Sequence, residues 1–454
     1  MNYTRIKPLL IPLFIFLAFA CSSEFDTSLQ HKLFTPEELR NDLNYLVEQL
    51  EKRHVDFYNR ANPDSIQKWH QRLSDQLNRP MTRKAFFLIA GLLNPYYKDA
   101  HCLLFPLRDE ANNDRDNGHQ LFPIYVTMDA NGLVHPERDY QRKTDGIMLE
   151  KGNAITSINQ IPIQEIIKQI SRYSHGETVQ LQRYMTTLLF SDWLYTIYGW
   201  KDEFKLSMMD GTRVDIHQED EWISLEKNNQ GFNSLTLMND IAYLKLNSFD
   251  VDEEEDAYEK FIEESFKSIK DAKINKLVID VRGNTGGQSD AGAKVIQYLI
   301  KEPVTQVSLA FERIHEGNSG FLDFRGKPGT LKELEVAHDD LIEPVNREKQ
   351  FDGQVVVLSD ELTYSAGIIF ITIMQDHGLA TLIGRPTGGF ANQTGNMETF
   401  ELPNTKLTVY APARTFVRVN KNESVHPVTP DVVVWPDSLP ETDEVLAKAI
   451  EILR

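Results

Sequence analysis

The chain has 454 residues, of which 41% are hydrophobic and 25% are charged, so its composition is that of a globular protein long enough for several domains. Its 48 Lys and Arg residues stand against 67 Asp and Glu residues, which gives a formal net charge of −19. A chain this acidic is repelled by nucleic acid, and no run of Lys and Arg offsets the repulsion, so no nucleic-acid partner is expected. The 12 histidines are scattered, without HExxH or clustered Cys/His spacing, so no metal site is predicted.

The N-terminal segment has the pattern of a secretory signal. Arg5 and Lys7 precede an apolar stretch, Leu9–Ala20, that ends at Cys21. This stretch is too short for a transmembrane helix, which needs about 20 residues, but it suits the core of a signal peptide. Its Leu-Ala-Phe-Ala-Cys end resembles a bacterial lipobox, in which the cysteine is diacylated and becomes the new N-terminus.

We therefore predict a lipoprotein signal peptide over residues 1–20, lipid attachment at Cys21 and a polar tether over 21–34. A plain signal peptide with an incidental cysteine is the alternative. The lipid would anchor the protein in a membrane of the bacterial cell envelope, on its periplasmic or surface face. Since no later stretch is apolar enough to span a bilayer, the lipid is the only membrane contact expected. Cys102 is then left without a disulfide partner.

Residues 35–110 are predicted to form a helical N-terminal domain. The first helix starts with a capping box over Thr35–Glu38 and a proline in its first turn. Further helices are expected over 65–77 and from Thr82 to a stop at Asn94. The face that the first helix buries consists of leucines at helical spacing: Leu39, Leu43, Leu46 and Leu50.

The rest of the chain divides into two further patterns. Residues 120–225 carry short strands, with one over 122–128, a strand–turn–strand over 149–159 and a helix over 163–170, which predicts a small β-rich module. Residues 232–454 alternate short apolar strands with helices, and this alternation predicts an α/β sheet covered by helices. The expected strands are 241–246, 276–281, 354–358 and 380–384, and the expected helices are 257–270, 291–300 and 365–375.

Ser365 is the first candidate for chemistry. It follows a buried strand and starts an apolar helix, where backbone N–H groups and the positive end of the helix dipole are available. That position suits a nucleophile whose reaction develops an oxyanion. A helix N-cap is the alternative role for a serine at such a position.

A glycine-rich loop over Asp280–Gly287 is the second candidate. Glycines after a strand let the backbone approach a ligand and aim N–H groups at it. The loop does not fit a phosphate-binding loop, because the spacing is neither GxxxxGK nor GxGxxG and no Lys-Ser/Thr follows. The loop indicates an active site because it occurs in the same sequence as the Ser365 segment.

Four motifs occur in a fixed order: Asp280–Gly287, Thr363–Gly367, Ile383–Gly389 and Val428–Asp431. This order resembles the serine peptidase family of C-terminal-processing (tail-specific) proteases, the tricorn core protease and the interphotoreceptor retinoid-binding proteins. The resemblance implies an α/β fold with a crotonase-like (ClpP/crotonase) catalytic core over residues 232–454. It also implies an inserted PDZ-like module over 120–225, which is degenerate because no Gly-Leu-Gly-Phe loop is present.

One departure from the family pattern bears on the base. Tail-specific proteases carry a lysine shortly after the position of Thr387, whereas residues 387–394 contain none. The tricorn-like branch takes a histidine from the N-terminal segment instead, and Asp99-Ala100-His101 matches that segment. The resemblance therefore implies His101 as the general base, with His426 as the alternative.

The same branch has a carboxylate before the Val428 motif, and this implies that Glu423 orients the histidine. Ala100 stands where the branch has a serine, so any support that the serine gives to the imidazole is absent or supplied otherwise. Cys102 could be read as a nucleophile, but its apolar neighbours indicate a buried, inert thiol.

The function that the resemblance implies is a lipid-anchored serine endopeptidase acting on peptides or protein tails. Ser365 would attack the peptide carbonyl, and the amides of Gly286 or Gly287 and of Ala366 would bind the oxyanion. No metal or organic cofactor is implied. The alternative is a non-catalytic protein of the same fold that binds an apolar ligand or peptide, as the retinoid-binding relatives do.

The lipid assignment predicts that Cys21→Ser releases the protein from membranes, because one residue carries the acyl chains that stable anchoring requires. Fractionation of cells that express the wild type and the variant measures this. A Cys21→Ser protein that stays in the membrane pellet after a high-salt wash contradicts the assignment.

Overall fold

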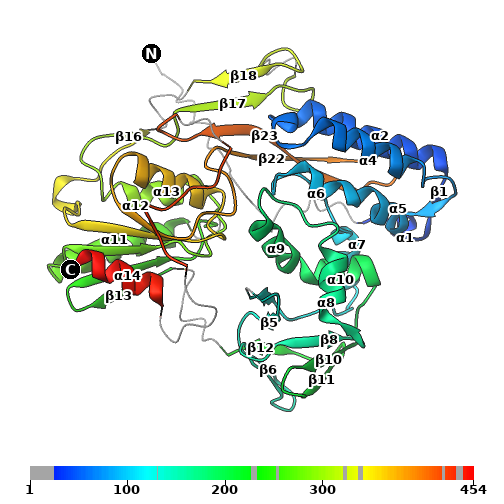
Figure 1. The fold of residues 1–454 in the computed structure, drawn as a ribbon, viewed down its shortest axis with the longest axis horizontal. Coiled ribbons are helices and arrows are strands. Elements are labelled where there is room, and N and C mark those ends of the chain that lie inside the picture. Colours follow the sequence, from blue (N-terminus) through cyan, green and yellow to red (C-terminus); the bar gives the residue numbers. More distant parts are fainter. Residues whose placement is uncertain are drawn as a thin grey trace, which may run out of the picture. The chain divides into compact units, whose positions relative to one another are not determined.

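The computed structural model describes residues 25–129, 131–225, 233–251, 255–320, 325–335, 341–421, 425–435 and 443–454. They form two compact units (Figure 1). The N-terminal unit comprises the described residues of Ala20–Gln230 and Glu398–Ala411, and the C-terminal unit those of Gly231–Met397 and Pro412–Arg454. The predicted signal peptide, Cys21 and Glu423 lie outside the described residues. No helix within the described ranges is long and apolar enough to cross a membrane.

The first part of the N-terminal unit is helical, as the leucine pattern predicts. α2 (Pro36–Arg53) begins at the predicted capping box, where the Glu38 amide donates to Thr35 Oγ1 (3.3 Å) and the Thr35 amide donates to Glu38 (2.7 Å). The predicted helix stop at Asn94 is wrong, because α6 (Asn94–Tyr97) starts there with its proline tolerated in the first turn. The other elements are α1 (Ser28–His31), β1 (Leu33–Phe34), α3 (Phe57–Arg60), α4 (Pro63–Ser74), β2 (Met81–Thr82), α5 (Arg83–Ala90), η1 (Gly91–Leu93), β3 (Leu103–Leu104) and α7 (Arg108–Asp116).

The second part of the N-terminal unit holds two sheets. The six-stranded sheet has the order β11-β10-β8-β5-β4, with β9 paired to β8, and the three-stranded sheet has the order β12-β6-β7. Two helices that the sequence pattern did not predict, α9 (Val179–Leu188) and α10 (Phe190–Tyr198), follow the predicted α8 (Ile163–Ile170). A single hydrophobic core runs through helices and sheets alike, from Leu43 to Trp193 and Phe204. The strands are β4 (Val126–Met128), β5 (Val134–Pro136), β6 (Tyr140–Arg142), β7 (Met148–Leu149), β8 (Ile155–Ile158), β9 (Ile161–Pro162), β10 (Phe204–Met208), β11 (Arg213–Ile216) and β12 (Trp222–Ser224).

The C-terminal unit is built on a six-stranded sheet of order β13-β14-β15-β20-β21-β24, parallel except for β13. Its central strands are the apolar segments predicted from the sequence, and alternate residues such as Val278, Val356 and Ile383 pack with Val445 of α14. The bounds are β13 (Asn233–Met238), β14 (Ile241–Leu246), α11 (Glu255–Asp271), β15 (Lys276–Asp280), α12 (Ser289–Ile296), β20 (Gln354–Ser359), α13 (Ala366–Asp376), β21 (Thr381–Gly384), β24 (Val432–Val433) and α14 (Glu444–Leu453).

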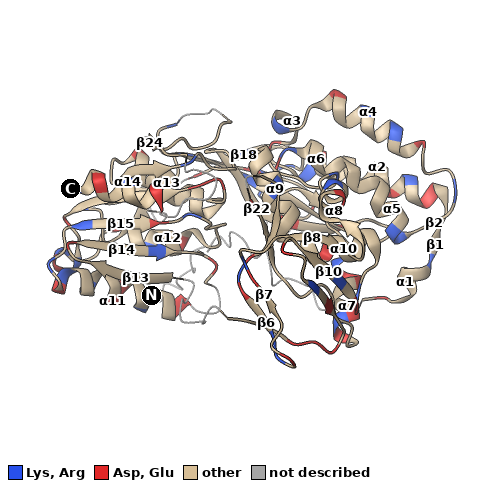
Figure 2. Cartoon of the chain, turned by 60° about the horizontal axis from the view of Figure 1, so that its bottom comes forward, with Lys and Arg blue, Asp and Glu red and all other residues tan. Residues whose placement is uncertain are grey.

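A second sheet, of order β18-β17-β23-β22, contains the long hairpin of β22 (Gln393–Glu401) and β23 (Thr408–Val417). The hairpin tip belongs to the N-terminal unit, where the buried Asp42 carboxylate accepts hydrogen bonds from the amides of Asn404 (2.9 Å) and Thr405 (2.7 Å). Figure 2 shows acidic and basic positions interspersed in both units. The remaining elements are β16 (Val304–Thr305), β17 (Leu309–Arg313), β18 (Leu331–Leu334), β19 (Leu341–Ile342) and η3 (Arg347–Lys349).

Candidate active site

Two loops of the C-terminal unit meet at the carboxyl ends of neighbouring parallel strands. β15 leads into the glycine loop and β20 leads into the serine loop, with Asp280 and Leu358 in register. Thr363 Oγ1 donates to the Val281 carbonyl (2.9 Å). The Tyr364 amide donates to the Asn284 carbonyl (2.9 Å). Hydrogen bonds thus hold together two motifs that are far apart in the sequence.

Ser365 has the geometry of a strained residue and not that of a helix cap. Its backbone angles are φ 52° and ψ −123°, a conformation that L-residues rarely adopt and that costs about 1–3 kcal/mol. The side chain makes no capping hydrogen bond, and its Oγ has no hydrogen-bond partner among the described residues although the residue is fully buried. The structure therefore does not support the N-cap alternative. The Ser365 carbonyl accepts hydrogen bonds from the Ile368 amide (2.8 Å) and Gln393 Nε2 (2.8 Å).

The glycines are required because the loop backbone lies against the serine. A Cβ on Gly286 (φ 102°) would be 2.7 Å from the Cβ of Ser365 and 2.9 Å from the Ala366 nitrogen. The Gly286 amide is already used, since it donates to Asn284 Oδ1 (2.9 Å). The amides of Gly287 and Ala366 form no hydrogen bond with the described part of the chain. Those two amides are therefore the available donors near Ser365.

Asn284 is a residue of this site to which sequence reasoning gave no role. Its carbonyl accepts from Tyr364 in the serine loop, its Oδ1 accepts from Gly286, and its Nδ2 donates to the Leu246 carbonyl (3.0 Å). The side chain is fully buried. Its place in the Asp-x-Arg-x-Asn motif was the only sequence signal for it.

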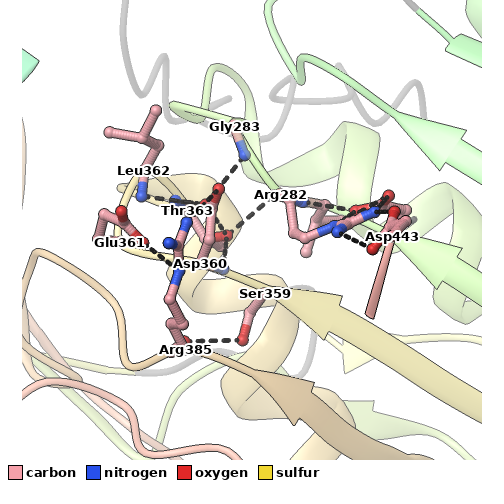
Figure 3. Close-up of polar contacts among 11 residues, drawn as sticks. Arg282, Gly283, Ser359, Asp360, Glu361, Leu362, Thr363, Arg385 and Asp443 are labelled. Carbon is pink, nitrogen blue, oxygen red and sulfur yellow. Dashed lines mark hydrogen bonds and ion pairs between the residues drawn. The ribbon is translucent and has the colours of Figure 1, made fainter. Parts of the chain in front are cut away.

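Asp360 ties the two loops together through one carboxylate oxygen (Figure 3). Its Oδ1 accepts hydrogen bonds from the amides of Gly283 (3.0 Å), Leu362 (3.0 Å) and Thr363 (3.0 Å). Burial raises the pKa of this carboxyl, while the Gly283 amide and Arg385 act in the opposite direction.

A second ion-pair group anchors the glycine loop to the C-terminal helix (Figure 3). The Arg282 guanidinium contacts Asp280 (2.6 Å) and forms a two-point contact with Asp443 (2.9 and 2.7 Å). Asp443 also caps α14, because its carboxylate accepts from the Leu446 amide (3.0 Å). The guanidinium therefore restrains the start of the loop, whereas the paired glycines lie at its end.

The two candidate bases belong to different units. His101 is in the N-terminal unit, fully buried, with its Nδ1 3.5 Å from Asp99 Oδ1. Burial lowers the pKa of His101, and Asp99 acts against that shift. His426 is an exposed residue of the C-terminal unit whose carbonyl accepts from the Ala391 amide (2.8 Å). The structure thus groups Ser365 with Gly286 and Ala366, and Gly287 follows in the same loop.

Residues 240–434, which include both loops, match the model of peptidase family S41. The chain contains a serine peptidase domain of family S41. No curated protein matches the chain.

Two solved structures of CPAF extend the likeness over most of this chain. The structure of mature CPAF covers 88% of this chain and 92% of its own, with a TM-score of 0.60 at 13% identity. Mature CPAF complexed with lactacystin covers 92% and 97%, with a TM-score of 0.63 at 13% identity. The photosystem II D1 C-terminal processing protease covers 91% and 97%, with a TM-score of 0.47 at 14% identity. The likeness to CPAF shows a shared mixed α/β fold.

The contact between Gly286 and Ser365 predicts that Gly286→Ala lowers turnover by about 10² or more, since the new methyl group must displace the serine and misplaced reacting groups cost about that much. Peptide hydrolysis and labelling of Ser365 by a fluorophosphonate measure the effect. Gly283→Ala is the matched control, because Gly283 has the same sign of φ (76°) but open space where its Cβ would lie. Equal activity of the two variants would show that the close approach is unimportant.

Proposed function

We propose that this S41 peptidase cleaves internal peptide bonds in peptides or protein tails, with Ser365 as its nucleophile. The observation that carries the assignment is the state of Ser365. Its hydroxyl lacks a partner among the described residues, its backbone is strained, and it lies at the N-terminus of α13 beside unused amides. Strain of this kind concentrates at functional sites, and a cap or a core serine would need none of it.

The chemistry follows from these groups. Ser365 Oγ attacks the peptide carbonyl carbon while its proton passes to the Nε2 of His101, and the carbonyl oxygen becomes an oxyanion. We assign the oxyanion to the amides of Gly287 and Ala366, with Gly286 supplying the close approach. Collapse expels the amine, which takes the proton from His101 and leaves an acyl-serine. Water then repeats the sequence and releases the acid.

The assignment of His101 as the base rests on the sequence. Residues 387–394 lack the lysine of tail-specific proteases, and Asp99-Ala100-His101 matches the histidine segment of the tricorn-like branch. In the structure, Gln393 holds the Ser365 carbonyl from this lysine-free segment. Glu423 remains the sequence prediction for the orienting carboxylate.

We also propose an assignment of the two units and a cellular location for the protein. We interpret the C-terminal unit as a crotonase-like core, and the support for this is its parallel sheet, in which the Asp280–Gly287 loop and Ser365 follow neighbouring strands. We interpret the β-rich part of the N-terminal unit as a degenerate PDZ-like module. The lipobox-like segment supports a lipoprotein of the bacterial cell envelope, anchored through Cys21.

Ser365→Ala should abolish both fluorophosphonate labelling and peptide hydrolysis while leaving the melting temperature nearly unchanged, because only one buried oxygen is removed. Mass spectrometry of the labelled wild type should place the adduct on Ser365. Labelling that persists in Ser365→Ala would assign the nucleophile elsewhere, and a wild type that neither labels nor cleaves would favour the non-catalytic binding protein.

His101→Gln should reduce turnover by about 10²–10⁴, the usual scale of general acid–base catalysis, because glutamine cannot take up a proton. The base must be neutral to act, and burial lowers its pKa from the ordinary value of 6.5. Wild-type activity should therefore rise at a pH below about 6.5 and stay level above it. A lysine base would place the rise nearer pH 7–8 or above. Near-normal turnover of His101→Gln would make His426 the next candidate.

A further inference from the structure

A closed group of polar side chains surrounds Asp99 in the N-terminal unit. The side chains of His54, Asp99 and His101 have no exposed surface, and Arg60 has almost none. Asp99 Oδ2 is 3.3 Å from His54 Nε2 and 3.6 Å from Arg60 Nε, while Asp99 Oδ1 faces His101. No set of three or more metal-binding side chains is arranged to hold an ion in the described ranges. The positive charge beside Asp99 comes from Arg60.

The proton positions in this group follow from the backbone. His54 Nδ1 accepts a hydrogen bond from the Asp56 amide (3.0 Å), so the neutral ring carries its proton on Nε2, which faces Asp99. Asp99 Oδ1 also accepts from the His101 amide (2.8 Å). Each oxygen of the Asp99 carboxylate therefore faces one imidazole. The hydrogen bond from the His101 amide fixes the orientation of Oδ1, which is the oxygen that faces His101 Nδ1.

The charges around Asp99 keep it ionised. Burial acts to raise the pKa of Asp99, but Arg60 and the hydrogen bonds from His101 and His54 together hold it well below its usual range. Glu177 completes the arrangement, since its Oε1 is 3.6 Å from Arg60 Nη1. A buried guanidinium shared between two carboxylates is far less costly than one left unpaired.

Side chains of the segment that precedes α9 contact the backbone of Ala100, the residue before His101. The Ala100 amide donates to Glu177 Oε2 (3.3 Å), and His175 Nε2 contacts the Ala100 carbonyl (3.1 Å). Burial lowers the pKa of His175 to about 4, so its ring is neutral and donates from Nε2. Two side chains thus restrain a position where the tricorn-like branch has a serine.

We propose that Asp99 is the positioning residue for His101. It holds the proton of His101 on Nδ1 and leaves the lone pair on Nε2, the nitrogen that accepts the serine proton, while Arg60 pairs with Asp99 and Glu177 holds Arg60 in place. This inference rests on the proposed function of His101 as the base. It places at Nδ1 the aspartate two residues before His101, where the family resemblance placed Glu423.

The kinetic test uses Asp99→Asn in the full chain. An uncharged amide no longer enforces the Nδ1–H form, and the same change in serine proteases costs about 10⁴ in kcat. We expect kcat to fall by about 10²–10⁴ with little change in KM. The acid limb of the residual activity should move to lower pH, because burial and Arg60 lower the pKa of His101 and Asp99 is the group that raises it.

Two controls separate positioning from folding. Asp42→Asn alters an equally buried carboxylate of the same unit that contacts the 404–405 turn, and it should leave kcat per folded molecule and the acid limb unchanged. Glu423→Gln should cost less than Asp99→Asn. A larger loss in Glu423→Gln, with an unchanged acid limb in Asp99→Asn, would overturn the inference in favour of Glu423.

The tautomer is measured in the wild type, so the test does not depend on a variant that folds. Nitrogen-15 NMR of histidine-labelled protein, assigned by the signal missing in His101→Gln, should show a protonated Nδ1 and an unprotonated Nε2 above the pKa of His101. The opposite tautomer overturns the inference. Normal turnover of His101→Gln would overturn the proposed function with it. An inactive His101→Gln beside a fully active Asp99→Asn would overturn only the role of Asp99.

Discussion

Gly286 and Ser365 meet with no room for a side chain between them, and the arrangement of the S41 site depends on that approach. It is possible because β15 and β20 are adjacent parallel strands whose carboxyl ends deliver both loops to one edge of the sheet. The strain in Ser365 is sustained by the bonds across this contact. Asn284 receives the Tyr364 amide, Thr363 donates to the Val281 carbonyl, and Asp360 accepts from Gly283. A strained residue persists only where its surroundings over-determine it.

Each unit contains a buried carboxylate that accepts hydrogen bonds from backbone amides, but in a different electrostatic setting. Asp360 is held chiefly by three amides, and burial raises its pKa. Asp99 is paired with Arg60 and two imidazoles, and its pKa is held low. A carboxylate whose only role is to accept hydrogen bonds from N–H groups can tolerate a raised pKa, at which the ionised form is less strongly favoured. The orienting role proposed for Asp99 requires a charged carboxylate, and the guanidinium of Arg60 beside it favours that form.

The sequence was most informative where function requires a particular residue type at one point of the chain. Glycines at 286 and 287, a serine directly after a buried strand and the absence of lysine in 387–394 are all local facts. The capping box of α2 and the parallel strands of the C-terminal sheet were predicted for the same reason, since propensity and periodicity act over a few residues. The helices α9 and α10 were missed because their burial depends on packing against elements that are distant in the chain, β4 for α9 and α7 for α10.

Hydrogen-bond partners were decided by the tertiary structure alone. From the sequence, Gly286 and Gly287 are equal candidates for the oxyanion, yet Asn284 takes the Gly286 amide. Ser365 could equally have been a cap, and only its backbone angles and partnerless hydroxyl argue against that role. Asp99 lies two residues before His101 in the sequence, but no role could be assigned to it there because its contacts with Arg60 and His54 form only on folding. The sequence states the residue type at each position. Which partner an amide or a carboxylate contacts depends on backbone torsions and neighbours that only the folded chain supplies.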